Sequence, residues 1–183
     1  MRRIVGLLLL ALALPTVGQA QDALDDVMQH APMASVFVLR ACGVESQSAS
    51  WTELAATAAA SYVVAAGTTY ALKHTIHEWR PDDSDRRSFP SGHATFAFAG
   101  ATTFRHEYGH LSPWVTVGGY SLAALVAADR VRRDRHYAHD VLAGAAIGTL
   151  STELTYYIKK RCIKSDNVDV VFTGQSLEVA VRW

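Results

Sequence analysis

Four uncharged segments rich in alanine, glycine and threonine dominate this chain, at residues 54–72, 94–104, 111–128 and 141–152. Small side chains of this kind let neighbouring helices approach closely. Residues 22–41 add a helix-like spacing of apolar positions, with Pro32 separating a polar first turn from an apolar remainder. These patterns predict an all-α fold, a compact helical bundle of about five helices.

Length and charge limit the class of protein. The 183 residues suit one domain with a sizeable core, and a chain that is 50% hydrophobic and 19% charged is neither disordered nor uniformly apolar. The 17 basic residues balance the 17 acidic ones. This balance argues against a nucleic-acid partner, which normally selects for a basic excess.

Residues 1–20 are typical of a secretory signal peptide. Arginines at positions 2 and 3 precede an apolar run over residues 4–14, and Gly18 and Ala20 suit cleavage before Gln21. The run is short for a membrane span, so we expect cleavage, with an uncleaved anchor helix as the alternative. A helical domain would then occupy residues 21–164 outside the cytoplasm.

The C-terminal residues 165–183 change to an alternating pattern. Hydrophobic residues occupy every second position on both sides of a turn signal at residues 173–175. We therefore predict a short C-terminal β-hairpin with one apolar face, which should pack on the bundle or on another surface. The alternating positions are Val168, Val170, Phe172, Leu177, Val179, Val181 and Trp183.

Cys42 and Cys162 are the two cysteines of the chain. An exported protein can oxidise such a pair, and a bridge closing so long a loop would contribute about 4 kcal/mol in the loop-entropy account. Two free buried thiols are the equally weighted alternative.

Three short stretches carry charged or nucleophilic groups. Lys73 and Arg80 are seven residues apart, which on one helix places both on the same face, where they could reach one anion. A solvated basic stripe has the same pattern. Ser91 is a good N-cap, and the following Gly92 and His93 would begin a helix whose amides and dipole favour an anion. An ordinary helix start that carries a surface histidine has the same pattern.

The third stretch contains Arg130, His136 and Asp140. An Asp four residues after a His would lie beside the imidazole on a helix and fix its tautomer, leaving the other ring nitrogen free to attack. Arg130 can clamp two phosphate oxygens.

In order and spacing these stretches resemble the type 2 phosphatidic acid phosphatase family, which shares its core with vanadium-dependent haloperoxidases and bacterial class A acid phosphatases. The family pattern is Lys-x6-Arg-Pro, then Pro-Ser-Gly-His, then Ser-Arg-x5-His-x3-Asp. Its positions here are Lys73, Arg80, Pro81, Pro90, Ser91, Gly92, His93, Arg130, His136 and Asp140. The resemblance covers residues 51–158.

The resemblance implies a phosphatase that needs no metal or other cofactor. His136 would attack phosphorus and form a phosphohistidine, Asp140 would orient its ring, and His93 would protonate the leaving group and then activate water. The remaining motif residues would bind the phosphoryl group: Lys73, Arg80, Ser91, Gly92 and Arg130. One position departs from the family, because Asp129 stands where a serine normally precedes Arg130. Its carboxylate would either compete with substrate for Arg130 or orient it.

Competing interpretations are a metal site, a haloperoxidase and a membrane protein that is not an enzyme. Histidine pairs with metal-ligand spacing occur, but no acidic or cysteine cluster accompanies them in the sequence. The pairs are His74 with His77, His106 with His110, and His136 with His139.

The expected partner is a phosphorylated small molecule or lipid. Apolar segments that end near the motifs favour a lipid-linked phosphomonoester or diphosphate at a membrane surface, with the enzyme on the periplasmic side and membrane-associated. A soluble periplasmic acid phosphatase is the alternative.

Overall fold

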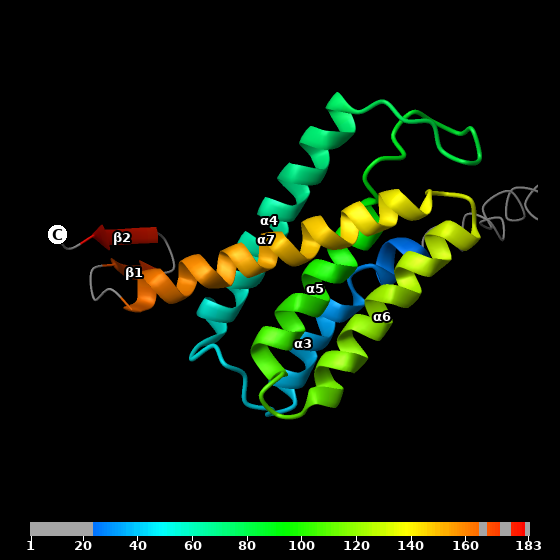
Figure 1. Cartoon of the computed structure of the whole chain (residues 1–183). Coiled ribbons are helices and arrows are strands. Elements are labelled where there is room, and N and C mark those ends of the chain that lie inside the picture. Colours follow the sequence, from blue (N-terminus) through cyan, green and yellow to red (C-terminus); the bar gives the residue numbers. More distant parts are fainter. Residues whose placement is uncertain (1–23, 165–167, 173–176, 182–183) are drawn as a thin grey trace, which may run out of the picture.

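The computed structural model describes residues 24–164, 168–172 and 177–181 (Figure 1). A short helical segment over residues 24–28 precedes five long helices and two strands. These are α3 (Ala31–Ala41), α4 (Trp51–Thr75), α5 (Gly92–Tyr108), α6 (Pro113–Arg132), α7 (Ala138–Lys164), β1 (Val168–Phe172) and β2 (Leu177–Val181). The predicted helical bundle is confirmed. The predicted signal peptide at residues 1–20 lies outside the described residues.

Local sequence signals set the helix starts. Ser50 caps α4 by accepting from Glu53 N, and the Glu53 side chain accepts from Ala49 N at 2.7 Å, which satisfies two amide groups at once. Ser112 caps α6 directly before Pro113, a residue suited to the first helical position. Pro32 likewise lies in the first turn of α3.

Helix α5 is the centre of the bundle, and it packs against α3, α4, α6 and α7 (Figure 1). Glycines permit the closest crossings. A Cβ atom at Gly148 of α7 would lie 2.2 Å from Thr95 O, and one at Gly144 would lie 2.4 Å from Ser91 O. The expected role of small residues in close helix packing is therefore confirmed, and it brings the start of α7 against the start of α5.

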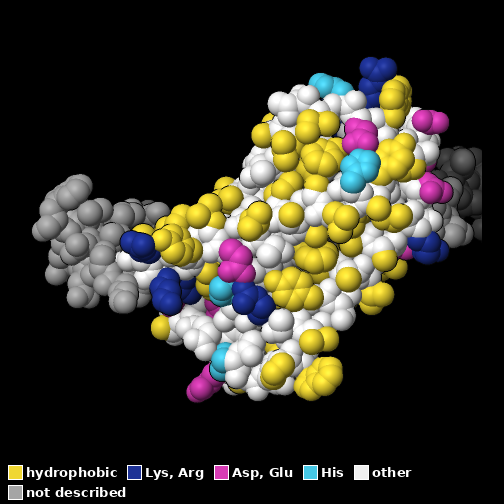
Figure 2. All heavy atoms as spheres, viewed as in Figure 1, with side chains coloured by type: hydrophobic (Ala, Val, Ile, Leu, Met, Phe, Trp, Pro, Cys, Tyr) yellow, Lys and Arg dark blue, Asp and Glu magenta, His cyan; other side chains and the backbone are white. Residues whose placement is uncertain are grey.

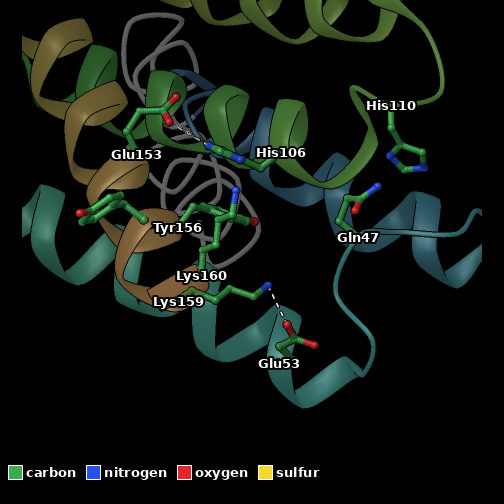
Figure 3. Close-up of a pocket in the computed structure, with 9 residues that line it drawn as sticks. Gln47, Glu53, His106, His110, Glu153, Tyr156, Lys159 and Lys160 are labelled. Atoms are coloured by element: carbon green, nitrogen blue, oxygen red, sulfur yellow. Dashed lines mark hydrogen bonds and ion pairs between the residues drawn. The ribbon is translucent and has the colours of Figure 1, made fainter. Parts of the chain in front are cut away.

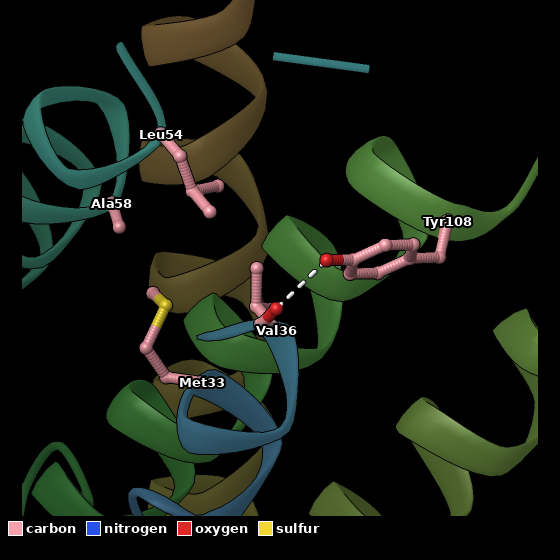
Figure 4. Close-up of a cluster of buried hydrophobic side chains, with 5 residues drawn as sticks. All are labelled: Met33, Val36, Leu54, Ala58 and Tyr108. Atoms are coloured by element: carbon pink, nitrogen blue, oxygen red, sulfur yellow. Dashed lines mark hydrogen bonds between the residues drawn. The ribbon is translucent and has the colours of Figure 1, made fainter. Parts of the chain in front are cut away.

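A hydrophobic cluster fixes α3 against α4 and α5 at the other end of the bundle (Figure 4). Tyr108 is fully buried and donates its hydroxyl to Val36 O at 2.8 Å. Met33, Leu54 and Ala58 complete the cluster. The hydroxyl contact matters because a buried tyrosine needs a hydrogen-bond partner.

The surface keeps many large hydrophobic side chains. Figure 2 shows them spread over one broad face, with charged groups sparse among them. Helices α6 and α7 contribute Trp114, Leu125, Leu142, Leu150 and Leu154, each more than half exposed. Over the described part of the chain, no helix combines the length and the hydropathy that crossing a membrane requires.

Three predictions from the sequence differ from the structure, for the helix that holds Lys73, for the cysteines and for the length of α7. Helix α4 ends at Thr75, where Ile76 takes an extended conformation. Arg80 lies in the following loop and does not share a helix with Lys73. No disulfide joins Cys42 and Cys162, which are both exposed rather than buried. Helix α7 continues beyond the predicted apolar run to Lys164.

The strands β1 and β2 pair antiparallel, from Val168 opposite Val181 to Phe172 opposite Leu177. The predicted turn at residues 173–175 lies outside the described residues, and packing of this pair on the bundle stays a prediction.

Candidate active site

The three motif stretches meet at one end of the bundle. Helix α4 ends there, α5 begins there, and the turn from α6 to α7 closes the group. A hydrogen bond from Ser91 N to Asp140 O, at 3.0 Å, joins the starts of α5 and α7 directly. The predicted residues therefore come from three regions far apart in the sequence and reach a common site.

His136 and Asp140 form the buried part of this site. Nδ1 of His136 lies 3.5 Å from Oδ2 of Asp140, and the two side chains are 3% and 0% exposed. The four-residue spacing predicts both residues on one helix, but α7 begins only at Ala138, after His136. The turn itself holds His136, because its backbone amide donates to Arg130 O at 3.3 Å.

Asp140 has further partners that no sequence motif indicates. Its Oδ2 accepts from the Ser88 hydroxyl at 2.5 Å and from Tyr137 N at 2.9 Å. The second bond closes the first turn of α7 in the manner of a capping carboxylate. A carboxylate held by a serine hydroxyl and a backbone amide is fixed in place, so it can fix the neighbouring imidazole.

The electrostatic surroundings keep His136 neutral. Burial, reinforced by the positive charges of Arg80 and Lys73 and opposed by Asp140, lowers the pKa of His136 to about 4. Nδ1 of His136 makes no hydrogen bond in this geometry, although Oδ2 of Asp140 lies 3.5 Å away. With its proton on Nδ1, the neutral imidazole has a lone pair on Nε2. This is the form that a histidine nucleophile requires.

Lys73 and Arg80 lie near this imidazole although they come from different local structures. Lys73, in the last turn of α4, donates to the carbonyls of Arg87 at 2.7 Å and Ser88 at 3.5 Å. Burial, together with the charge of Arg80, lowers the pKa of Lys73 to about 8. Arg80 is held by Asp85, whose Oδ1 accepts from Nε at 3.0 Å.

The start of α5 agrees in part with its predicted role. Ser91 is the N-cap of α5, as expected, but its side chain is fully buried, and its hydroxyl accepts from Ala94 N at 3.5 Å. A Cβ at Gly92 would meet no atom within 4 Å, so there is open space beside the first amides of the helix. Backbone amides are therefore the anion-binding groups that the geometry offers here.

Arg130, in the last turn of α6, is already bonded to carboxylates. Its Nη2 contacts Oδ2 of Asp25, which also pairs with Arg133, and lies 3.1 Å from Oδ2 of Asp129. Asp129, the residue that replaces the family serine, also binds Arg132 at 2.7 Å. Although partial burial opposes it, hydrogen bonds from Arg132 and Arg130 lower the pKa of the Asp129 carboxyl.

His93 is paired with the residue next to Asp25. Its Nε2 lies 3.0 Å from Oδ1 of Asp26. Burial and the charge of Arg130 lower the pKa of His93, while Asp26 opposes this shift. The acidic pair of the short helix 24–28 thus contacts two predicted site residues, and no motif in the sequence signalled this.

A separate hollow of about 800 Å³ lies beside the C-terminal half of α7 (Figure 3). Two ion pairs lie in its wall, with Lys159 2.9 Å from Glu53 and His106 3.1 Å from Glu153. None of the predicted site residues lines it, although the histidine pair His106 and His110 does. These paired charges brace α4, α5 and α7 at the end opposite the candidate site.

Comparison with known proteins agrees with this geometry. Residues 82–164 match the PAP2 superfamily. A lipid A 1-phosphatase of Porphyromonas gingivalis is 38% identical over 141 residues, which are 77% of this chain but only 32% of that protein. The crystal structure of LpxE from Aquifex aeolicus has a similar fold, with a TM-score of 0.55 and 18% identity over 75% of this chain and 86% of that one. The matched segment contains the second part of the loop before α5, together with α5, α6 and the whole of α7, and this part of the chain belongs to the PAP2 superfamily.

Proposed function

We propose that residues 21–164 form a metal-independent phosphatase that works through a phosphohistidine intermediate. The observation that carries the proposal is the state of His136: buried, neutral, with Nδ1 facing a fixed carboxylate and two cations nearby. His136 Nε2 attacks phosphorus, and the P–O bond to the leaving group breaks. Asp140 stabilises the positive charge that develops on the ring.

Binding of the phosphoryl group falls to Lys73, Arg80, Arg130 and the amides at Gly92, with Ser91 supporting the turn. The Asp25 carboxylate supports this assignment, because its oxygen already bonds the guanidinium groups of Arg130 and Arg133. Phosphate oxygens need the same donors. Fixed cations stabilise the charge that builds on those oxygens in the transition state.

His93 serves as acid and then as base. Its pKa is lowered by burial and by Arg130, and a phosphate that displaces Asp26 from Nε2 supplies a new negative partner. The protonated ring passes its proton to the departing oxygen. The neutral ring then takes a proton from the water that hydrolyses the phosphohistidine.

The proposed substrate class is a lipid-linked phosphomonoester or diphosphate. The similarity to a lipid A 1-phosphatase supports a lipid substrate. The exposed hydrophobic side chains of α6 and α7 support work at a membrane surface, since exposed apolar area of this extent marks an interaction face. We place the enzyme on the exported, periplasmic side and in association with the membrane.

Phosphate release from a panel of substrates tests the proposal. The panel should include lipid A 1-phosphate, phosphatidic acid, an isoprenyl diphosphate and p-nitrophenyl phosphate, with wild type compared with His136→Ala. We expect a loss of several orders of magnitude in the variant, because the nucleophile is gone. Activity should persist in a chelator and be inhibited by vanadate. Equal rates for the two proteins, or loss of activity on chelation, would refute the assignment.

A further inference from the structure

We propose that Glu78, His139 and Asp140 form a divalent-cation site of the zinc class that shares Asp140 with the candidate active site. One ligand atom from each residue lies within 4.8 Å of the others. In the sequence no acidic or cysteine cluster accompanies the histidine pairs, and the basic residues of the motifs would repel a cation. The fold supplies that cluster by bringing the loop after α4 against the start of α7, with Glu78 Oε1 2.8 Å from His139 Nε2.

The buried carboxylate of Asp140 has an oxygen that no hydrogen bond uses. Asp140 is fully buried, and its Oδ1 accepts no hydrogen bond, although Oδ2 is bonded twice. His139 Nε2 lies 3.1 Å from this Oδ1 and hydrogen-bonds Glu78 at 2.8 Å. One imidazole nitrogen carries at most one hydrogen, so it cannot serve both carboxylates. A cation bound between the three groups would satisfy all of them.

Contacts within the protein hold the three ligands near one another before any ion binds. Ser88 ties two of them together, because its amide donates to Glu78 O at 3.1 Å and its hydroxyl to Asp140 Oδ2. The His139 ring stacks on Tyr137, with ring centroids 5.4 Å apart and planes inclined by 8°. A fixed ligand set reduces the ordering cost of binding.

Ligand type and spacing favour zinc over the alkaline-earth ions. One imidazole and two carboxylates suit Zn²⁺, whereas Mg²⁺ and Ca²⁺ prefer all-oxygen shells. Ligands of tetrahedral zinc lie about 3.4 Å apart, given metal–ligand distances near 2.1 Å. The observed 2.8 and 3.1 Å separations need only a small outward movement of Glu78 and His139, which are 31% and 57% exposed.

Two nearby cations do not block the site. Lys73 donates to the carbonyls of Arg87 and Ser88, and Arg80 is bonded to Asp85. The carboxylates of Glu78 and Asp140 therefore face the imidazole of His139 without a competing hydrogen bond from either cation in the described residues.

Isothermal titration of the full, metal-free protein with zinc chloride tests the site. No substrate is present, so the result is independent of the proposed phosphatase activity. We expect one saturable equivalent in wild type, weakened at least about tenfold in His139→Ala and in Glu78→Gln. His110→Ala, a histidine of the separate hollow, is the matched control and should keep it. Magnesium chloride should bind far more weakly.

Helical circular dichroism checks that each variant folds. X-ray absorption at the zinc edge of the wild-type protein, which needs no variant, should show one imidazole nitrogen among oxygen ligands. The proposal is overturned if no single equivalent binds, if both variants bind as tightly as wild type, or if the shell holds several imidazoles.

Discussion

Asp25 offers the sharpest perturbation of the anion site. Its carboxylate bonds Arg130 and Arg133, and the side chains of Asp25 and Arg130 are only 16% and 6% exposed. A phosphate that uses Arg130 must therefore displace an anion that is already bound. Asp25→Asn keeps the size of the side chain and removes its charge.

The expected gain follows from the bond that is weakened. A hydrogen bond to a charged group contributes about 1.5–3 kcal/mol, more when solvent is excluded. Because about 1.4 kcal/mol corresponds to a tenfold change in affinity, the variant should bind phosphate at least tenfold more tightly. Asp129 remains 3.1 Å from Arg130, so the guanidinium keeps one partner and the fold should persist.

Isothermal titration with inorganic phosphate measures this effect without relying on turnover. Asp134→Asn is the control, because it removes an equal charge from an exposed position in the turn after α6. We expect unchanged affinity there. If Asp25→Asn binds phosphate no better than wild type, then the Asp25 carboxylate does not occupy a phosphate-binding position at Arg130.

Three further predictions follow from single contacts. The pKa of Lys73 is lowered to about 8, and its ammonium is present below that value, so KM should rise as pH increases through it in wild type but not in Lys73→Arg. Gly148→Ala should lower the free energy of unfolding by about 1–3 kcal/mol in denaturant titrations, because its Cβ would clash with α5. Gly67→Ala, in open space on α4, should raise it by about 0.5–1 kcal/mol; similar losses at both glycines would contradict the packing account. Ser88→Ala should lower kcat roughly tenfold with little change in KM, because it loosens Asp140; an unchanged kcat would remove Ser88 from the site.

The bundle was predictable because its signals are local. Ser50, Ser91 and Ser112 each cap the helix that follows them, and the small residues of α5 and α7 allow the close crossing that the composition indicated. The four-residue spacing of His136 and Asp140 was likewise sufficient to predict that their side chains lie side by side.

What the sequence did not reveal depends on contacts between distant segments. Asp25 reaches Arg130 across 105 positions, and Ser88 reaches Asp140 across 52. No periodicity or spacing rule encodes such pairs. The end of α4 at Thr75 was also missed, because position 76 is an isoleucine and not a helix-breaking residue. The loop that follows is held by the contact between Arg80 and Asp85, which the sequence pattern does not indicate.

The central claim is that His136 becomes covalently phosphorylated during turnover. Rapid quenching of the reaction into alkali, where phosphohistidine survives, followed by peptide mass spectrometry measures this directly. We predict a phosphate on the peptide that contains His136, and none in His136→Ala. The phosphorylated peptide should accumulate in His93→Ala, because water attacks the intermediate slowly when the base is missing. A phosphate on Ser91 instead, or full turnover with no phosphorylated His136 at any time, would contradict the mechanism.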